Sequence, residues 1–171
     1  KALPDFFGSF ASTMTWKNVD LYLGFQYSYG NDVFNANYIQ AARFGGVDYN
    51  QMAYYKDRWT TDNPSSTQYA QMSVGTMSSV FVEDASFLRF KTARIGYTLN
   101  GDWLKKSKII RNAKVYVAAE NLYTFTKYSG YDPEITGSQS AGSMTSVLTS
   151  GFDYGVFPRA KTFTAGLNIV F

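Results

Sequence analysis

The sequence predicts an all-β chain built from transmembrane barrel strands, and three observations lead to this fold class. Hydrophobic and polar residues alternate with a period of two over several segments, which is typical of strands with one apolar face. The connections between these segments alternate between short and long, as in outer-membrane barrels. Aromatic residues make up 18% of the 171 residues and charged residues only 17%, which suits strands with an apolar face.

Five strands are expected, at about residues 9–16, 19–29, 87–99, 113–125 and 160–171. The second is the clearest, because from Val19 to Tyr29 every odd position is apolar or aromatic and most even positions are polar or small. The last segment repeats the pattern up to Phe171. Near Phe90 the alternation of the third segment changes phase, which predicts a β-bulge there or an exit from the apolar slab.

The connections suggest which side of a membrane each end of the strands faces. The first two strands are joined by little more than Lys17 and Asn18, and the third and fourth by about residues 100–112. The two other connections, about 30–86 and 126–159, are too long for a compact soluble sandwich. If Phe171 is periplasmic, both short connections are periplasmic and both long loops are extracellular.

Five strands cannot close a barrel, because open edges in lipid would leave backbone groups unpaired. Residues 1–171 are therefore expected to be the C-terminal part of a larger barrel. The first residues lack an initiator Met and a signal peptide, so we expect an internal or mature start.

Composition excludes several classes of function. The chain has no cysteine and no histidine, which excludes disulfides, zinc sites of the usual kind and Ser-His or Cys-His nucleophiles. We therefore expect no enzyme, no cofactor and no metal. The net charge of +3 arises from one short basic segment (Lys105, Lys106, Lys108, Arg111 and Lys114), which favours a solvated turn or a contact with anionic lipid over nucleic-acid binding.

Alternation alone also fits a soluble sheet with one wet face. The alternative function is thus a soluble β-sheet module that binds carbohydrate through exposed aromatic rings. Three features favour the membrane reading: aromatic residues near the ends of the apolar faces, an amphipathic strand that runs to the terminal Phe171, and a basic connection on the same side as that terminus.

Four segments, taken in order, resemble SusC/RagA-type TonB-dependent transporters of the Bacteroidetes. Residues 87–99, FLRFKTARIGYTL, are similar to the family element LRLKN-x-x-LGYTLP, and residues 115–134 to VYVSGENLFTFTKYSGFDPE. Residues 25–35 are similar to FQYSYGNDVYN, and residues 151–171 to the closing strand of the family. Departures occur at Thr92, Asn100 and Phe157, where the family usually has Asn, Pro and Tyr.

This resemblance implies the last five strands of a 22-stranded barrel in the bacterial outer membrane. It implies import of glycans or peptides together with a SusD-like surface lipoprotein, energised by a TonB complex. In the family the plug domain and the TonB box are N-terminal, so the resemblance places both outside this chain.

Two groups of residues are candidates for contact with a substrate. The alternation places polar residues on the expected luminal face, where they could contact substrate or plug or simply be solvated; these are Asp20, Tyr22, Gln26, Arg94, Tyr116 and Glu120. The first long loop carries aromatic residues that could stack on sugars or pack against the rim or the lipoprotein; these are Tyr38, Tyr49, Tyr54, Tyr55, Trp59 and Tyr69.

The final strand is expected to carry an assembly signal. In the general class of membrane barrels, a terminal aromatic residue on the lipid face contributes to recognition by the insertion machinery. Here the signal would comprise Phe163, Leu167, Ile169 and Phe171, which also suit interfacial anchoring. Two further candidates are a calcium site from Asp132, Glu134 and Asp153, which lacks EF-hand spacing, and a glycosidase pair of Glu120 with Asp132, whose separation the sequence does not fix.

Overall fold

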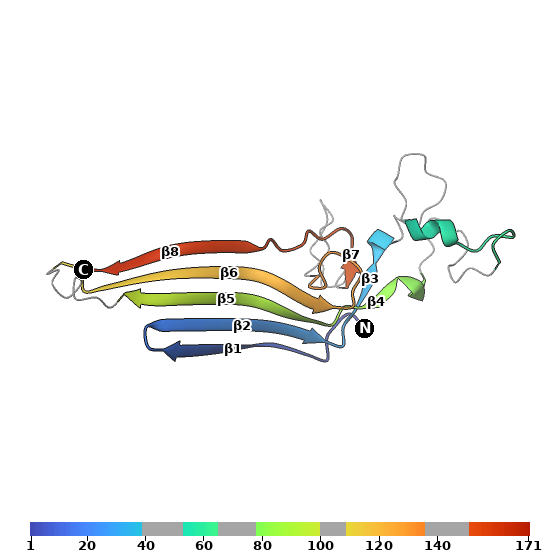
Figure 1. The fold of residues 1–171 in the computed structure, drawn as a ribbon. Coiled ribbons are helices and arrows are strands. Elements are labelled where there is room, and N and C mark those ends of the chain that lie inside the picture. Colours follow the sequence, from blue (N-terminus) through green and yellow to red (C-terminus); the bar gives the residue numbers. More distant parts are fainter. Residues whose placement is uncertain (39–52, 65–77, 100–108, 136–150) are drawn as a thin grey trace, which may run out of the picture. The chain divides into compact units, whose positions relative to one another are not determined.

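The computed structural model describes residues 1–38, 53–64, 78–99, 109–135 and 151–171. These residues form two compact units. One is a five-stranded sheet with short flanking segments, and the other is a small three-stranded sheet with its loops. Figure 1 shows the strands of both sheets.

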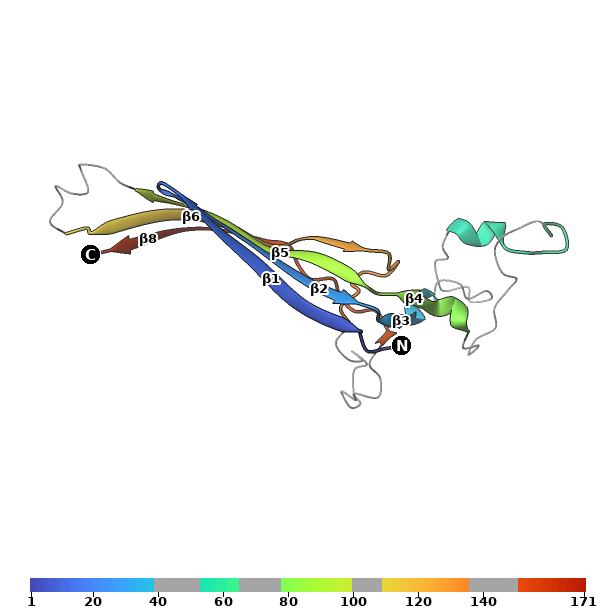
Figure 2. The same ribbon diagram turned by 90° about the horizontal axis from the view of Figure 1, so that it is seen from below.

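The large sheet consists of β1 (Phe6–Trp16), β2 (Val19–Tyr29), β5 (Phe87–Leu99), β6 (Asn112–Thr126) and β8 (Thr162–Val170). The strands lie side by side in this order, and every neighbouring pair is antiparallel (Figure 1). Figure 2 shows the twist of the sheet. The five predicted strands are therefore confirmed, with β1 beginning three residues earlier than expected and β8 ending before Phe171.

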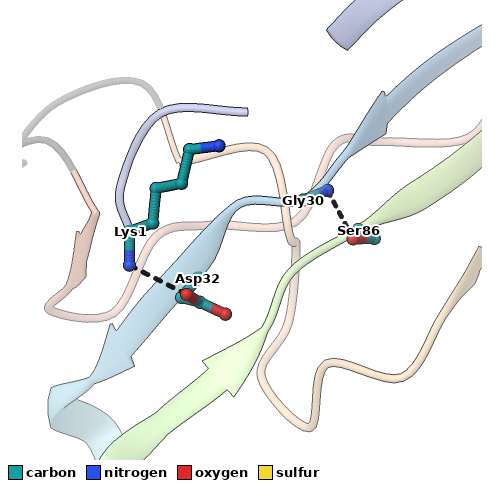
Figure 3. A network of polar contacts seen from close by, with 4 residues as sticks. All are labelled: Lys1, Gly30, Asp32 and Ser86. Atoms are coloured by element: carbon teal, nitrogen blue, oxygen red, sulfur yellow. Dashed lines mark hydrogen bonds and ion pairs between the residues drawn. The ribbon is translucent and has the colours of Figure 1, made fainter. Parts of the chain in front are cut away.

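The β1–β2 turn and the end of β8 lie at the same end of the large sheet (Figure 1). Lys17 forms the turn with a φ of 53°, and its ammonium group lies 4.8 Å from the centre of the Trp16 ring. At the opposite end, β2 stops at Gly30, whose φ of 83° favours glycine and whose amide donates a 3.0 Å hydrogen bond to Ser86 Oγ (Figure 3).

The small sheet was not predicted. It consists of β3 (Asp32–Asn35), β4 (Val82–Asp84) and β7 (Phe152–Asp153), in the order β4-β3-β7. β4 pairs antiparallel with β3, whereas β7 runs parallel to it. Two short 3₁₀ helices, Ala53–Asp57 and Ser79–Phe81, lie in the same unit. The expected long loops thus contain regular structure of their own.

Candidate functional site

The large sheet has one face that is apolar across all five strands; we call it the apolar face. The register aligns Leu21 with Ile95, Ile95 with Val117, and Val117 with Ala165, so alternate residues of neighbouring strands share this side. Large side chains of this face remain exposed on all five strands; they include Phe10, Met14, Trp16, Tyr29, Ile95, Tyr97, Val115, Val117, Tyr123, Phe125, Phe163, Leu167 and Ile169. An exposed apolar surface of this extent normally marks a contact with lipid or protein.

Three stacked rings cross the apolar face. Phe10 and Phe25 stack with ring centres 4.9 Å apart, and Phe25 and Phe90 with ring centres 4.8 Å apart. The planes are inclined by 14° in both pairs. Such cross-strand pairs fix the register of β1, β2 and β5, because a one-residue slip would turn the rings to the other face.

A bulge interrupts the large sheet at one level. On β5, Lys91 is an extra residue relative to β2, since Gly24 pairs with Thr92 and Phe25 with Phe90. On β6, two residues lie between the partners of Phe90 and Thr92, and Asn121 has a φ of 52°. The predicted bulge near Phe90 is confirmed, and it explains why the alternation of this strand changes phase.

The opposite side of the sheet, here called the polar face, carries an ion pair that passes over a glycine. Lys114 Nζ lies 2.5 Å from Asp20 Oδ1, so β6 is linked to β2 across the strand between them. The pair passes over Gly96 of β5, where any Cβ atom would meet both side chains. Lys114 therefore belongs to the sheet rather than to a solvated basic turn.

Rings lie over further glycines of the polar face. The Tyr22 ring lies over Gly24, and the Arg94 guanidinium carbon is 6.0 Å from the centre of that ring. The Tyr116 ring lies over Gly166 of β8 in the same way. These aromatic rings occupy the space that a side chain at each glycine would fill.

The structure places the predicted luminal residues on the polar face. Gln26 accepts a 2.9 Å hydrogen bond from Lys91 Nζ, and Arg94 is exposed beside Tyr22. Glu120 is exposed at the register position shared with Thr92 and Thr162. Sequence reasoning missed Arg89, which is 2% exposed, donates from Nε to Thr124 Oγ1 at 3.1 Å and lies 5.2 Å from the Phe87 ring.

The predicted loop aromatics are only partly within the described residues. Trp59 is exposed, and Tyr54 and Tyr55 lie in the helix Ala53–Asp57, although their side chains are not described. Tyr49 and Tyr69 lie outside the described residues, as do Lys105, Lys106 and Lys108. Tyr38 packs against Phe81 with ring centres 5.7 Å apart. A sugar contact by these rings stays a prediction.

The predicted assembly residues cluster at the C-terminal edge of the large sheet. Phe163, Leu167 and Ile169 share the apolar face of β8, and Phe163 is 71% exposed. Phe171 follows the last residue of that strand and is also exposed. Their role in assembly stays a prediction.

The small sheet has its own core and a buried carboxylate. Val33, Ala85 and Tyr128 pack together, with Ile135 against them. Asp153 is 0% exposed, and it accepts a 2.5 Å hydrogen bond from the Tyr128 hydroxyl and bonds of 2.9 and 3.0 Å from the amides of Gly155 and Val156. Burial, together with the bond to Asp153 and the charges of Asp153 and Glu83, raises the pKa of Tyr128 well above its usual range.

A second polar network joins β3 to β4 and to the segment that follows β6. Asn35 Nδ2 donates to Glu83 Oε1 at 2.9 Å and to Ser129 Oγ at 3.2 Å. Glu83 also accepts hydrogen bonds of 2.8 Å from the amide and the hydroxyl of Ser129. These contacts link β3 to β4 and satisfy the side-chain amide of Asn35 and the carboxylate of Glu83.

The geometry does not support the candidate calcium site or the candidate glycosidase pair. The Asp132 carboxylate accepts a 2.9 Å hydrogen bond from the Glu134 amide, whereas the Asp153 carboxylate accepts one from the Tyr128 hydroxyl. Among the described residues, no group of three or more acidic residues could hold a metal ion. Glu120 and Asp132 belong to different units. Within the described parts of the chain, no helix is long and apolar enough to cross a membrane.

Comparison with known proteins adds independent information. No protein-family model matches the chain. It is 32% identical over 173 residues to TonB-dependent receptor P26 of Formosa agariphila, a match that covers 99% of this chain and 17% of that protein. It is 33% identical to receptor P3 of the same organism, over 98% of this chain and 16% of that protein.

SusC of Bacteroides thetaiotaomicron, another TonB-dependent receptor, is 33% identical over 56% of this chain and 8% of its own length. The structure of the RagAB peptide importer in its open-open state is similar with a TM-score of 0.82 and 28% identity, over 98% of this chain and 17% of that one. The chain thus spans about one sixth of the relatives that it matches over nearly its whole length.

Taken together, the antiparallel sheet and its two faces define the class as membrane β-barrel strands. The chain belongs to the SusC/RagA type of TonB-dependent receptors. These relatives are receptors and transporters, not enzymes, in agreement with the prediction from composition.

Proposed function

We propose that this chain forms part of the β-barrel of a TonB-dependent transporter in the bacterial outer membrane. The observation that carries the proposal is the exposed apolar face, which extends across five adjacent strands of nine to fifteen residues. A tilted strand needs about 9–11 residues to cross the hydrocarbon core. Contact with lipid would remove the apolar face from water, which is energetically favourable.

The two outer strands support a place within a larger barrel. β1 and β8 are the edges of the described sheet, and each would leave a row of backbone groups unpaired in lipid. Further strands of the same receptor would pair with them, and the resemblance implies 22 strands in all. The five strands of the large sheet would then be barrel wall, with the plug and the TonB box elsewhere in the receptor.

The proposed cargo is a glycan or a peptide too large for a porin. The RagAB similarity supports a peptide, because that structure is a peptide importer, whereas the resemblance to SusC leaves glycans open. A SusD-like surface lipoprotein is the proposed partner at the loop side, and a TonB complex supplies energy through parts of the receptor outside this sequence.

The polar face would line the lumen, where Gln26, Arg94 and Glu120 would face plug or cargo, with Arg94 and Glu120 exposed and Gln26 half-buried. Trp59, together with Tyr49, Tyr54 and Tyr55, is the proposed aromatic contact of the outer loop. Phe163, Leu167, Ile169 and Phe171 are the proposed assembly signal. Deleting Phe171 in the full-length receptor should lower its level in the outer membrane, and an unchanged level would contradict this role.

The proposal can be tested on the intact receptor. Expressed with its leader, the receptor should fractionate with the outer membrane, show heat-modifiable gel mobility and co-purify with a lipoprotein. A soluble monomer that needs no detergent would contradict the proposal and favour the soluble carbohydrate-binding module instead. That module is disfavoured here because it would have to keep the apolar face in water.

A further inference from the structure

The bulge in β5 changes which charges share the polar face. Arg89 and Arg94 are separated by an odd number of positions, so on a regular strand their side chains would point to opposite faces. With Lys91 inserted between them, Arg89 contacts Thr124 and Arg94 contacts the Tyr22 ring, both on the polar face. Bulges often serve to re-aim a side chain near a functional site.

Lys91 itself also reaches the polar face, where it donates to Gln26. On the described strands this face carries four basic residues, Arg89, Lys91, Arg94 and Lys114, and two acidic ones, Asp20 and Glu120. Lys114 and Asp20 neutralise each other across Gly96. The net charge of the remaining residues around the bulge is therefore positive. Glu120 is the one other acidic side chain on this face of the described sheet.

The two accessible cations of this region keep N–H groups for a ligand, because Lys91 uses one of its three donors on Gln26 and Arg94 contacts a ring. Lys91 and Arg94 are exposed, whereas Arg89 is buried and contributes positive charge to the same face. Arg94 rests against the Tyr22 ring, which orients the guanidinium without using its N–H groups. A guanidinium held in this way can donate two parallel hydrogen bonds to a carboxylate or a sulfate.

We propose that Lys91 and Arg94, gathered on the polar face by the bulge, form a binding patch for the anionic groups of the transported cargo. The inference rests on the proposed transport function and narrows it: the cargo is an oligomer that carries carboxylate or sulfate groups. Both residues lie nearer to the loop end of β5 than Gly96 does, and the Asp20–Lys114 pair passes over Gly96. In the proposed orientation, cargo that enters from outside meets this patch before the Asp20–Lys114 pair.

The test uses the intact receptor, purified from the outer membrane, and two pairs of probes. One pair is an oligogalacturonate and an uncharged dextran oligomer of equal length, and the other is a Glu-Gly repeat peptide and its Gln-Gly counterpart. The receptor should bind at least one anionic probe more tightly than its neutral partner. The preferred pair distinguishes a glycan from a peptide cargo, and the preference should fall as salt is raised above about 0.1 M.

Variants then assign the preference to the patch. The double variant Lys91→Gln with Arg94→Gln should bind the anionic probe about tenfold more weakly, with the neutral probe unchanged. Glu120→Gln should bind the anionic probe more tightly than the wild type. The matched control is Lys17→Gln with Arg111→Gln, which removes two exposed cations at the other end of the sheet and should change neither affinity.

Several results would overturn the proposal. These are the absence of any anionic preference, a preference that survives in the double variant, and an equal loss of anionic and neutral binding, which would assign the patch to the protein's own packing. Should the double variant fail to assemble, Lys91→Gln and Glu120→Gln alone must shift the anionic affinity in opposite directions. An inserted receptor that imports neutral oligomers equally well would overturn this inference and leave the proposed transport function intact.

Discussion

The two units of the chain are stabilised in different ways. The small sheet buries Val33, Phe81, Ala85 and Tyr128 and satisfies a fully buried carboxylate, as a water-soluble domain does. The strands of the large sheet are several times longer, yet among its described residues Phe87 and Ala113 are the only buried apolar ones. Strands with clean alternation can therefore form an exposed apolar face instead of a buried core. Such a face needs lipid or another part of the protein to cover it.

The largest expected effect separates the two faces of the large sheet. Val117→Arg places a charge on the apolar face, where it should destabilise the folded receptor in liposomes by about 2–4 kcal/mol near the bilayer midplane. Val117 is 49% exposed, so in a soluble sheet the same change would cost less than about 0.5 kcal/mol. Urea titration of the heat-modifiable form measures the difference.

Thr164→Arg is the matched control for this prediction. Thr164 is also exposed, and it lies on the polar face beside Ala118. Its substitution should change stability little. Equal costs for the two variants would remove the distinction between the faces.

The next effect concerns the small sheet. Asp153→Ala removes the acceptor of the Tyr128 hydroxyl and of two amides, and it should destabilise this unit by about 2–3 kcal/mol. Hydrogen exchange should accelerate in β3 and β7 and remain unchanged in β5 and β6. Asp57→Ala, an exposed carboxylate in the same unit, is the control; acceleration throughout both sheets would mean that the units do not open independently.

A smaller effect is expected at Gly96. A valine there would collide with Lys114 and Asp20 and separate their charged groups, at a cost of about 1–2 kcal/mol. Thr98→Val, on the same strand and face, should be close to neutral. A stable Gly96→Val variant would show that the ion pair contributes little to the sheet.

The smallest effect depends on pH. Because the pKa of Tyr128 is raised in the fold, the neutral phenol stabilises the small sheet fully below about pH 10, where the unfolded phenol ionises. That contribution should decline as the pH rises further, and faster hydrogen exchange in β3 would report it. Tyr128→Phe should abolish the pH dependence, and its persistence would assign the transition to another group.

Much of the large sheet could be predicted from the sequence, since a period of two over nine to fifteen residues is a strong signal. The phase change near Phe90 even located the bulge. The sequence did not assign Arg89 to a face, because the size of the register shift at the bulge depends on how β5 pairs with both β2 and β6.

The small sheet escaped prediction for a different reason. Its strands have only two to four residues, too few to show a period, and β7 pairs with β3 from a distant part of the chain. The carboxylate of Asp153 looked like a possible calcium ligand, whereas its true partner is the hydroxyl of Tyr128. Only the folded arrangement reveals such a contact.

The central claim, that the apolar face contacts lipid and the polar face contacts water, can be measured directly on β2. Nitroxide labels on single cysteines at Leu21, Tyr22, Leu23, Phe25 and Gln26 of the full-length receptor in liposomes would report access to oxygen and to a water-soluble nickel complex. We expect a period of two, with oxygen favoured at Leu21, Leu23 and Phe25 and nickel at Tyr22 and Gln26. Uniform access along the strand, or the opposite phase, would contradict the account.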